Sequence, residues 1–325
     1  MQRIDQAESA QPSAPRGVLA PSPAGHWRPL KPGNFGWLGS ISDAILRREI
    51  TSTDHFPYLG GAQTLLVASD YAGTRSSPYR VYAFLTTVVE SLAPWRASIA
   101  QLRASQLPER RRMSFKRLGD GHRAEALVPF LDAANRIPGV LLLVAFSKSV
   151  GDLLDEPSDR YLFSKISHWK PAVREELFRV LCLVSLLVAG LSRPGHDVLW
   201  LSDEDAIVSN SARMQEMAPA FMQIASSVVP HQMGNLRFAT TGQDSGDLDR
   251  EDLAAIPDLA AGALLNFLQH EHALTSDTLA LDERAGPIMW WLANGTRPPA
   301  CVLLLDRDKN HKLNIRTIGF RAEQR

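Results

Sequence analysis

Residues 64–70 read Thr-Leu-Leu-Val-Ala-Ser-Asp, a continuous apolar run that ends in an acid. Two later runs have the same character: residues 140–146 read Val-Leu-Leu-Leu-Val-Ala-Phe, and residues 197–201 read Asp-Val-Leu-Trp-Leu. A continuously apolar strand offers no face to water, so such strands are typical of a sheet that helices cover on both faces. The three runs therefore predict a layered α/β protein.

The segments between these runs complete the expected alternation of strands and helices. The Gly- and Ser-containing residues 71–78 predict a turn, and the β-branched and aromatic residues 79–89 predict a second strand. The remaining strands are expected over 113–118, 236–241 and 301–305, and the helices over 41–50, 92–106, 121–135, 170–191, 206–225 and 252–270.

The chain of 325 residues is long enough for one large domain or two smaller ones, at roughly 100–200 residues per domain. Six of the 21 prolines lie in residues 1–33, a composition that buries little surface. We therefore predict that residues 1–40 form an extended or partly disordered N-terminal segment, which contacts the body through Trp27. Residues 41–325 are expected to form a single domain with a C-terminal elaboration.

The only two cysteines, Cys182 and Cys301, exclude a disulfide framework and a Cys-rich zinc site. Each lies in an apolar run, so we expect two buried thiols. Few cysteines, and a start that lacks the pattern of a signal peptide, favour the reducing cytoplasm. The most apolar stretch, residues 177–190, is too short to span a membrane and contains Arg179, so it predicts a buried helix.

The 35 basic and 35 acidic side chains give a net charge of zero, which excludes a uniformly basic nucleic-acid-coating protein. A local basic cluster is still present, and it consists of Arg110, Arg111, Arg112, Lys116, Arg117 and Arg123. Two interpretations stay open for this cluster. It is either a solvated loop and helix start, or a patch that contacts the phosphates of a nucleic acid without reading its sequence.

Acidic residues occur where the carboxyl ends of the predicted strands meet. Asp70 ends the first run, and Asp203 follows the strand over 197–201, with Glu204 and Asp205 as alternatives. Asp258 lies inside an apolar helix, where an unpaired carboxylate is costly unless a cation offsets it. Carboxylates of this kind suit Mg²⁺ or Mn²⁺, and two such ions about 4 Å apart can activate water against a phosphodiester. A lone carboxylate after a strand is otherwise a turn residue.

The order of these features resembles a prokaryotic family of uncharacterised proteins with an RNase H-like core. The resemblance covers about residues 62–270 and rests on the strand that ends at Asp70, on Phe115-Lys116-Arg117-Leu118, on Leu201-Ser202-Asp203-Glu204 and on Pro257-Asp258-Leu259-Ala260-Ala261-Gly262-Ala263. It implies an RNase H-like mixed sheet flanked by helices. Of these motifs, the one in the late helix is the most specific.

The resemblance also implies roles for individual residues. Asp70 and Asp258 match the first and last acids of the family, Asp203 is our choice for the acid between them, and Lys116 matches a lysine of the middle segment. The implied metal ligands are therefore Asp70, Asp203, Asp205 and Asp258, and the implied ions are Mg²⁺ or Mn²⁺. This chain departs from the family at Ser114, where the family has an acid; Glu125 is a candidate to replace it.

Three hypotheses for function follow. The first is a metal-dependent nuclease, in which the aspartates hold the ions and Lys116 and the arginines hold the phosphates. The alternative is a catalytically inactive RNase H-like binding or scaffold subunit of a bacterial defence or mobile-element assembly, which Ser114 favours. The third is a phosphohydrolase that acts on a nucleotide. The expected partners are nucleic acid, a protein partner or a second copy of the chain, and no membrane.

Overall fold

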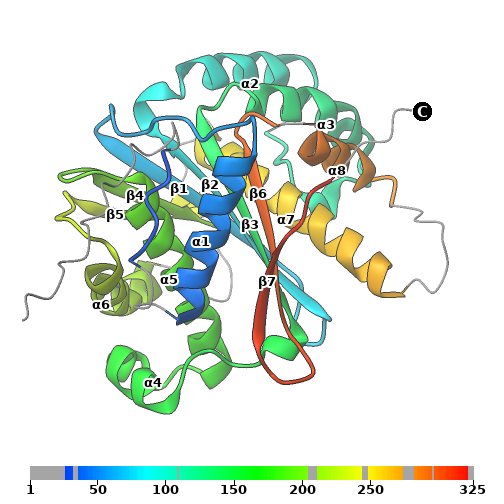
Figure 1. The fold of residues 1–325 in the computed structure, drawn as a ribbon. Coiled ribbons are helices and arrows are strands. Elements are labelled where there is room, and N and C mark those ends of the chain that lie inside the picture. Colours follow the sequence, from blue (N-terminus) through cyan, green and yellow to red (C-terminus); the bar gives the residue numbers. More distant parts are fainter. Residues whose placement is uncertain are drawn as a thin grey trace, which may run out of the picture.

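The computed structural model describes residues 26–31, 36–107, 110–203, 211–243, 248–273, 282–294 and 296–320. Within these ranges the protein is an α/β fold with one mixed sheet (Figure 1). Its strands are β1 (Thr64–Ala72), β2 (Tyr79–Val88), β3 (Gly139–Ser147), β4 (Asp197–Ser202), β5 (Leu236–Thr240), β6 (Ala300–Arg307) and β7 (Leu313–Thr317). Its α-helices are α1 (Gly36–Thr51), α2 (Ala93–Ser105), α3 (Gly121–Ala134), α4 (Glu156–Leu162), α5 (Pro171–Leu191), α6 (Ser211–Val228), α7 (Asp249–Ala273) and α8 (Gly286–Ala293).

The seven strands are arranged in the order β5-β4-β1-β2-β3-β6-β7. β1, β2 and β3 are successive antiparallel neighbours, whereas β4 is parallel to β1 and β5 is parallel to β4. On the other side β6 is parallel to β3, and β7 returns antiparallel to β6. The carboxyl ends of β1, β3, β4, β5 and β6 therefore meet at one edge of the sheet, which we call the carboxyl edge.

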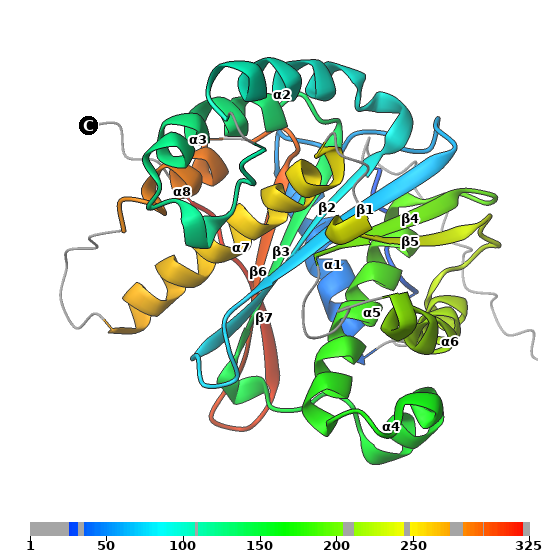
Figure 2. The same cartoon turned by 180° about the vertical axis from the view of Figure 1, so that it is seen from behind.

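Helices cover both faces of the sheet, as the continuous apolar strands predict. α1, α5 and α6 pack on one face, which is in front in Figure 1, against Leu65 and Val67 of β1. α2, α3, α7 and α8 pack on the other face, which is in front in Figure 2, against Leu66 and Ala68. Successive side chains of a strand point to opposite faces, so Asp70 points with Leu66 and Ala68 toward the layer of α7.

Two predictions about the central region are wrong. β1 does not end at Asp70 but continues through Tyr71 to Ala72, because these residues pair with β2, and the turn begins only at Gly73. The predicted strand over 113–118 is a 3₁₀-helix, η2 (Phe115–Arg117). Arg117 donates to the carbonyl of Ser114 at 3.0 Å and Leu118 to that of Phe115 at 3.2 Å, so these N–H groups do not pair with a strand.

The other predicted elements are confirmed to within five residues at their ends, except that the first part of the helix expected over 206–225 lies outside the described residues. α4, α8 and β7 have no counterpart in the sequence-based prediction. α4 and β7 are short and carry several polar residues, which hides their pattern. α8 (Gly286–Ala293) holds the exposed Trp290 beside the buried Trp291, a pair that does not reveal its period.

The prediction that Trp27 ties the N-terminal segment to the body is confirmed. Trp27 is 4% exposed, its indole N–H lies 3.2 Å from the carbonyl of Ser42, and its backbone N–H donates to Glu49 at 3.0 Å. The indole lies directly against Gly190 of α5, where a Cβ would collide with the ring. Residues 1–25 and 32–35 lie outside the described residues.

Both cysteines are buried, as expected, in the layer of α1, α5 and α6. Burial raises the pKa of the Cys301 thiol to about 12 and raises that of Cys182 further. Among the helices that the structure describes, none is both long enough and apolar enough to cross a membrane.

Replacing Gly190 with alanine is expected to destabilise the fold by about 1–2 kcal/mol, because the added methyl group displaces the Trp27 indole and this cost exceeds the helix propensity gained. The free energy of unfolding in urea measures the effect. Gly61→Ala is the matched control, since the nearest atom to its Cβ is 3.8 Å away. Equal stability of the two variants would contradict the role of Trp27.

Candidate active site at the carboxyl edge of the sheet

The pairing of β1 with β4 brings two of the predicted acids to equivalent positions. In the register of these parallel strands, Ser69 lies opposite Ser202. Asp70 follows Ser69 and Asp203 follows Ser202, so both acids come directly after this pair. Asp203 follows Leu201 by two residues and, like Asp70, lies on the side of α7. α7 crosses β1 and β2 on this face, and it contributes Asp258.

The three aspartates line one cavity of about 120 Å³. The cavity is lined by Asp70, Arg112, Met113, Ser114, Arg117, Asp203, Thr241, Glu251, Ala254, Ala255 and Asp258. Asp258 thus faces this cavity although its neighbours on α7 are nearly all apolar. Four carboxylates therefore converge from β1, from the end of β4 and from two turns of α7.

Glu251 is a lining residue that the sequence reasoning missed. It lies seven residues before Asp258, a spacing that places both on one face of α7. Its side chain is 6% exposed and forms an ion pair with Arg112. Glu125, the candidate for the missing acid, is exposed on α3 and does not line the cavity. The spacing of seven could have revealed Glu251 if the predicted helix had started before residue 252.

α7 holds the middle segment of the site through two residues one turn apart. The backbone N–H of Phe115 donates to Oδ2 of Asp258 at 2.8 Å, and the Phe115 ring lies directly on Gly262. A Cβ at position 262 would collide with that ring. The Asp-Leu-Ala-Ala-Gly part of the motif therefore has a structural reason, because the acid holds the backbone of Phe115 and the glycine leaves room for its side chain.

The environment of Asp258 disfavours its negative charge. Burial raises the pKa of this carboxyl, and the nearby Asp203 raises it further. The Phe115 N–H and the Ser114 hydroxyl, which both donate to the carboxylate, lower the pKa without offsetting burial, and so does the charge of Lys116. Ser114 thus supplies a hydrogen-bond donor to Asp258, at a position where the resemblance described above leads us to expect an acid.

Hydrogen bonds orient the other two aspartates. The Thr241 hydroxyl donates to Oδ1 of Asp203 at 2.5 Å, and the backbone N–H of Tyr71 donates to Oδ1 of Asp70 at 2.5 Å. Both donors lie at the carboxyl edge, Thr241 directly after β5 and Tyr71 within β1. The two carboxylates are thereby held by one group of β1 and one group directly after β5.

Half of the predicted basic cluster is engaged in ion pairs within the protein. Arg111 and Arg123 both pair with Asp120, Arg112 pairs with Glu251, and the buried Arg123 also donates to the carbonyl of Arg112 at 2.7 Å. These contacts fold the loop before η2 onto α3 and α7.

Arg110, Lys116 and Arg117 form the other half of the cluster. All three are exposed, and within the described residues their side chains have no hydrogen-bond or ion-pair partner. Arg117 lines the cavity, and Lys116 is close enough to Asp258 to lower its pKa.

Carboxylate oxygens are the donors that a divalent cation prefers, and the mutual repulsion of Asp203 and Asp258 is a cost that a cation would relieve. In the part of the chain that the structure describes, no three His, Cys, Asp or Glu side chains are grouped closely enough to hold one metal ion. Glu204 and Asp205 lie outside the described residues.

No protein-family model matches this chain, and no curated protein sequence matches it significantly. The chemistry of the site therefore rests on its own residues.

Two ion pairs join α7 to α2, Arg96 with Asp249 and Arg103 with Asp252. Arg103 donates from Nε to Oδ2 of Asp252 at 2.6 Å and from Nη2 to its other carboxylate oxygen. Asp252 is 1% exposed. Burial raises its pKa to about 6, because the cost of desolvation exceeds the stabilisation by Arg103.

Gly262→Ala is expected to displace Phe115 from α7 and to destabilise the fold by about 1–3 kcal/mol through overpacking. The free energy of unfolding and the amide NMR signal of Phe115 measure the two effects. Gly119→Ala, in the same segment but with open space around its Cβ, is the control and should leave both unchanged. An unshifted Phe115 signal in Gly262→Ala would contradict the close contact.

Asp252 should also give the fold a defined pH dependence. Its pKa is higher in the folded state, so its contribution to stability is fully present below the unfolded pKa and is lost as the pH rises to about 6. The change from 3.8 to about 6 corresponds to about 3 kcal/mol. Asp252→Asn lacks this loss, so the stability of the variant relative to the parent should rise by about 2 kcal/mol between pH 4 and pH 6, with the remainder of the change outside this range.

Urea unfolding at several pH values measures the difference. The exposed Asp132→Asn serves as the control and should run parallel to the parent. Parallel curves for Asp252→Asn and the parent would show that the pKa is not raised.

Proposed function

We propose that this protein is a divalent-metal-dependent nuclease that hydrolyses phosphodiester bonds of DNA or RNA. The observation that carries the proposal is the convergence of Asp70, Asp203 and Asp258 on one cavity. These residues are far apart in the sequence and come from three different elements. Carboxylates that repel one another in a shared, partly buried cavity are typical of sites that bind cations.

The sheet supports an RNase H-like core as the finer description of the fold. Such a core has an antiparallel meander of three strands, extended by two parallel strands beside the first. β1, β2 and β3 have the first arrangement, and β4 and β5 have the second. β6 and β7 are then additions to the far side of the meander.

In this proposal Asp70, Asp203 and Asp258 would hold Mg²⁺ or Mn²⁺, with Glu251 in reach of the same cavity. When bound, the metal would lower the pKa of a water molecule and stabilise the leaving oxygen of the phosphodiester. The chain itself would orient the carboxylates through Tyr71, Thr241 and Phe115. Asp205 stays a predicted ligand.

The exposed cations would bind the substrate backbone. Arg117 forms part of the cavity wall, and Lys116 lies near Asp258, so each could contact a phosphate held at the acids. Arg110 would extend this surface along the loop. Arg111, Arg112 and Arg123 would instead act from within the protein, by holding the loop in place through Asp120 and Glu251. Contacts of this kind position a strand without reading its sequence.

A non-catalytic scaffold subunit is the second candidate, and Ser114 favours it. The Ser114 hydroxyl donates to Asp258 and supplies no negative charge to the cavity. A two-metal site needs its full set of carboxylates, so a site that lacks one would bind Mg²⁺ or Mn²⁺ weakly. Titration with Mn²⁺ discriminates between the two candidates.

The test is cleavage of labelled single- and double-stranded DNA and RNA with Mg²⁺, Mn²⁺ or EDTA. The parent should cleave at least one substrate in the presence of metal. Asp70→Asn and Asp258→Asn should each lower the rate at least 100-fold, because removal of a metal ligand removes charge that stabilises the transition state. Asp132→Asn removes an exposed carboxylate elsewhere and should cleave like the parent.

Cleavage that persists in EDTA or in Asp70→Asn would refute the proposed site. A folded parent that cleaves none of the substrates and does not bind Mn²⁺ would favour the scaffold.

A further inference from the structure

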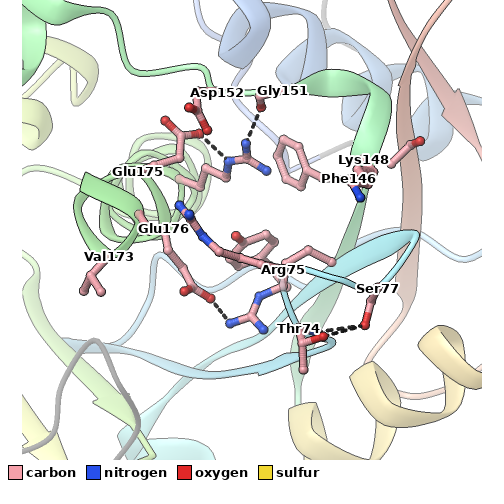
Figure 3. Close-up of a pocket in the computed structure, with 15 residues that line it drawn as sticks. Thr74, Arg75, Ser77, Phe146, Lys148, Gly151, Asp152, Val173, Glu175 and Glu176 are labelled. Atoms are coloured by element: carbon pink, nitrogen blue, oxygen red, sulfur yellow. Dashed lines mark hydrogen bonds and ion pairs between the residues drawn. The ribbon is translucent and has the colours of Figure 1, made fainter. Parts of the chain in front are cut away.

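A second and larger pocket lies at the same carboxyl edge, on the opposite face of the sheet from the acids. Its volume is about 420 Å³, within the range of about 300–1,000 Å³ that small-molecule sites occupy. It lies among the turn between β1 and β2, the 3₁₀-helix η3 (Lys148–Val150) after β3, and the first turns of α5 (Figure 3). Phe146 and Tyr82, each 1% exposed, form its closed floor.

Two arginines inside the pocket are held in fixed positions. Arg179 donates from Nε to Glu175 at 2.6 Å and from Nη2 to the carbonyl of Gly151 at 2.5 Å, and its guanidinium lies 4.8 Å from the centre of the Phe146 ring. Arg80 is held in the same way, by an ion pair with Glu176 and a hydrogen bond to the carbonyl of Gly73. A guanidinium has five N–H donors, so these bonds leave donors for a ligand.

The acids of the pocket are largely satisfied by the protein itself. Glu175 accepts from the backbone N–H groups of Leu153 at 3.0 Å and Leu154 at 2.9 Å in addition to Arg179. Glu176 is paired with Arg80. Of the three lining acids, only the exposed Asp152 lacks a side-chain partner among the described residues.

Two further cations line the pocket without a partner. Arg75 in the turn after β1 and Lys148 in η3 are exposed, and within the described ranges neither side chain has a hydrogen bond or an ion pair. In Figure 3, Lys148 lies on the side of the strands, across the pocket from Glu175 and Glu176 on α5. The charges of Arg80 and Arg179 are balanced by those of Glu176 and Glu175. The positive Arg75 and Lys148 then outnumber the negative Asp152, so the pocket is complementary to an anion.

We propose that this pocket binds a small organic phosphate, with a nucleoside monophosphate as the best match. A phosphomonoester carries about 1.5 to 2 negative charges at neutral pH, and guanidinium groups match its geometry. Arg75 and Lys148 bind the phosphate, and the fixed Arg80 and Arg179 add donors behind it. The half-buried apolar side chains of Ala172 and Val173 hold the nucleoside, and Asp152 accepts from its hydroxyl or amino groups. The phosphate group that binds here belongs either to a free nucleotide or to the 5′-phosphate end of a nucleic-acid strand.

Isothermal titration of the full chain tests this site with four probes: adenosine monophosphate, adenosine, and a dinucleotide with or without a 5′-phosphate. Adenosine monophosphate should bind at least 10-fold more tightly than adenosine. The double variant Arg75→Ala/Lys148→Ala should weaken this binding at least 10-fold. Arg47→Ala/Arg136→Ala removes the same charge from exposed positions outside the pocket and should change the affinity for adenosine monophosphate less than two-fold.

Tighter binding of the phosphorylated dinucleotide than of the monophosphate would identify a strand end as the source of the phosphate, and the reverse would identify a free nucleotide.

Asp258→Asn separates this site from the acid cavity. Binding of adenosine monophosphate within two-fold of the parent supports the pocket, whether or not the protein is a nuclease. Loss of binding in Asp258→Asn, an equal loss in both double variants, or no saturable binding to the folded parent would overturn the proposal.

Discussion

The parallel pairing of β1 with β4 is the constraint on which the candidate site depends. The register that sets Ser69 opposite Ser202 brings Asp70 and Asp203 to the same edge. The alternation of side chains along β1 then directs Asp70 to one face, because Leu65 and Val67 are buried on the other. A slip of one residue would exchange the two faces of the strand, so the buried apolar residues fix the position of the acid as firmly as they fix the strand.

The sequence revealed those parts of the structure that depend on local pattern. Apolar runs predicted the strands β1, β3 and β4, and the position of acids after these runs or within an apolar helix predicted the three aspartates of the cavity. The prediction of a strand over 113–118 was wrong because Met113 and Phe115 alternate with polar residues, which is the pattern of a strand. The backbone of this segment is bound by Asp258 of α7, which lies 143 residues after Phe115 in the sequence. No local pattern reveals such a contact.

Distant partners also explain why the basic cluster could not be resolved from sequence. Six neighbouring cations look equivalent in the sequence, but Arg112 pairs with a glutamate far along the chain, and Arg111 and Arg123 share one aspartate. The fold thus divides the cluster into residues that hold the loop and residues that face solvent. Glu251 was missed for a related reason, since its spacing from Asp258 has meaning only once both lie in one helix.

Because of where the two cysteines lie, a thiol reagent can detect the opening of one helical layer of the protein but not of the other. Cys182 and Cys301 both lie in the core beneath α1, α5 and α6, and the core beneath α2, α3, α7 and α8 contains no thiol. A thiol reagent can therefore react only when the first layer opens. Opening of the second layer, which carries the acid cavity, leaves both thiols protected. The rate of alkylation would therefore report local opening of the first layer and would not respond to opening of the second.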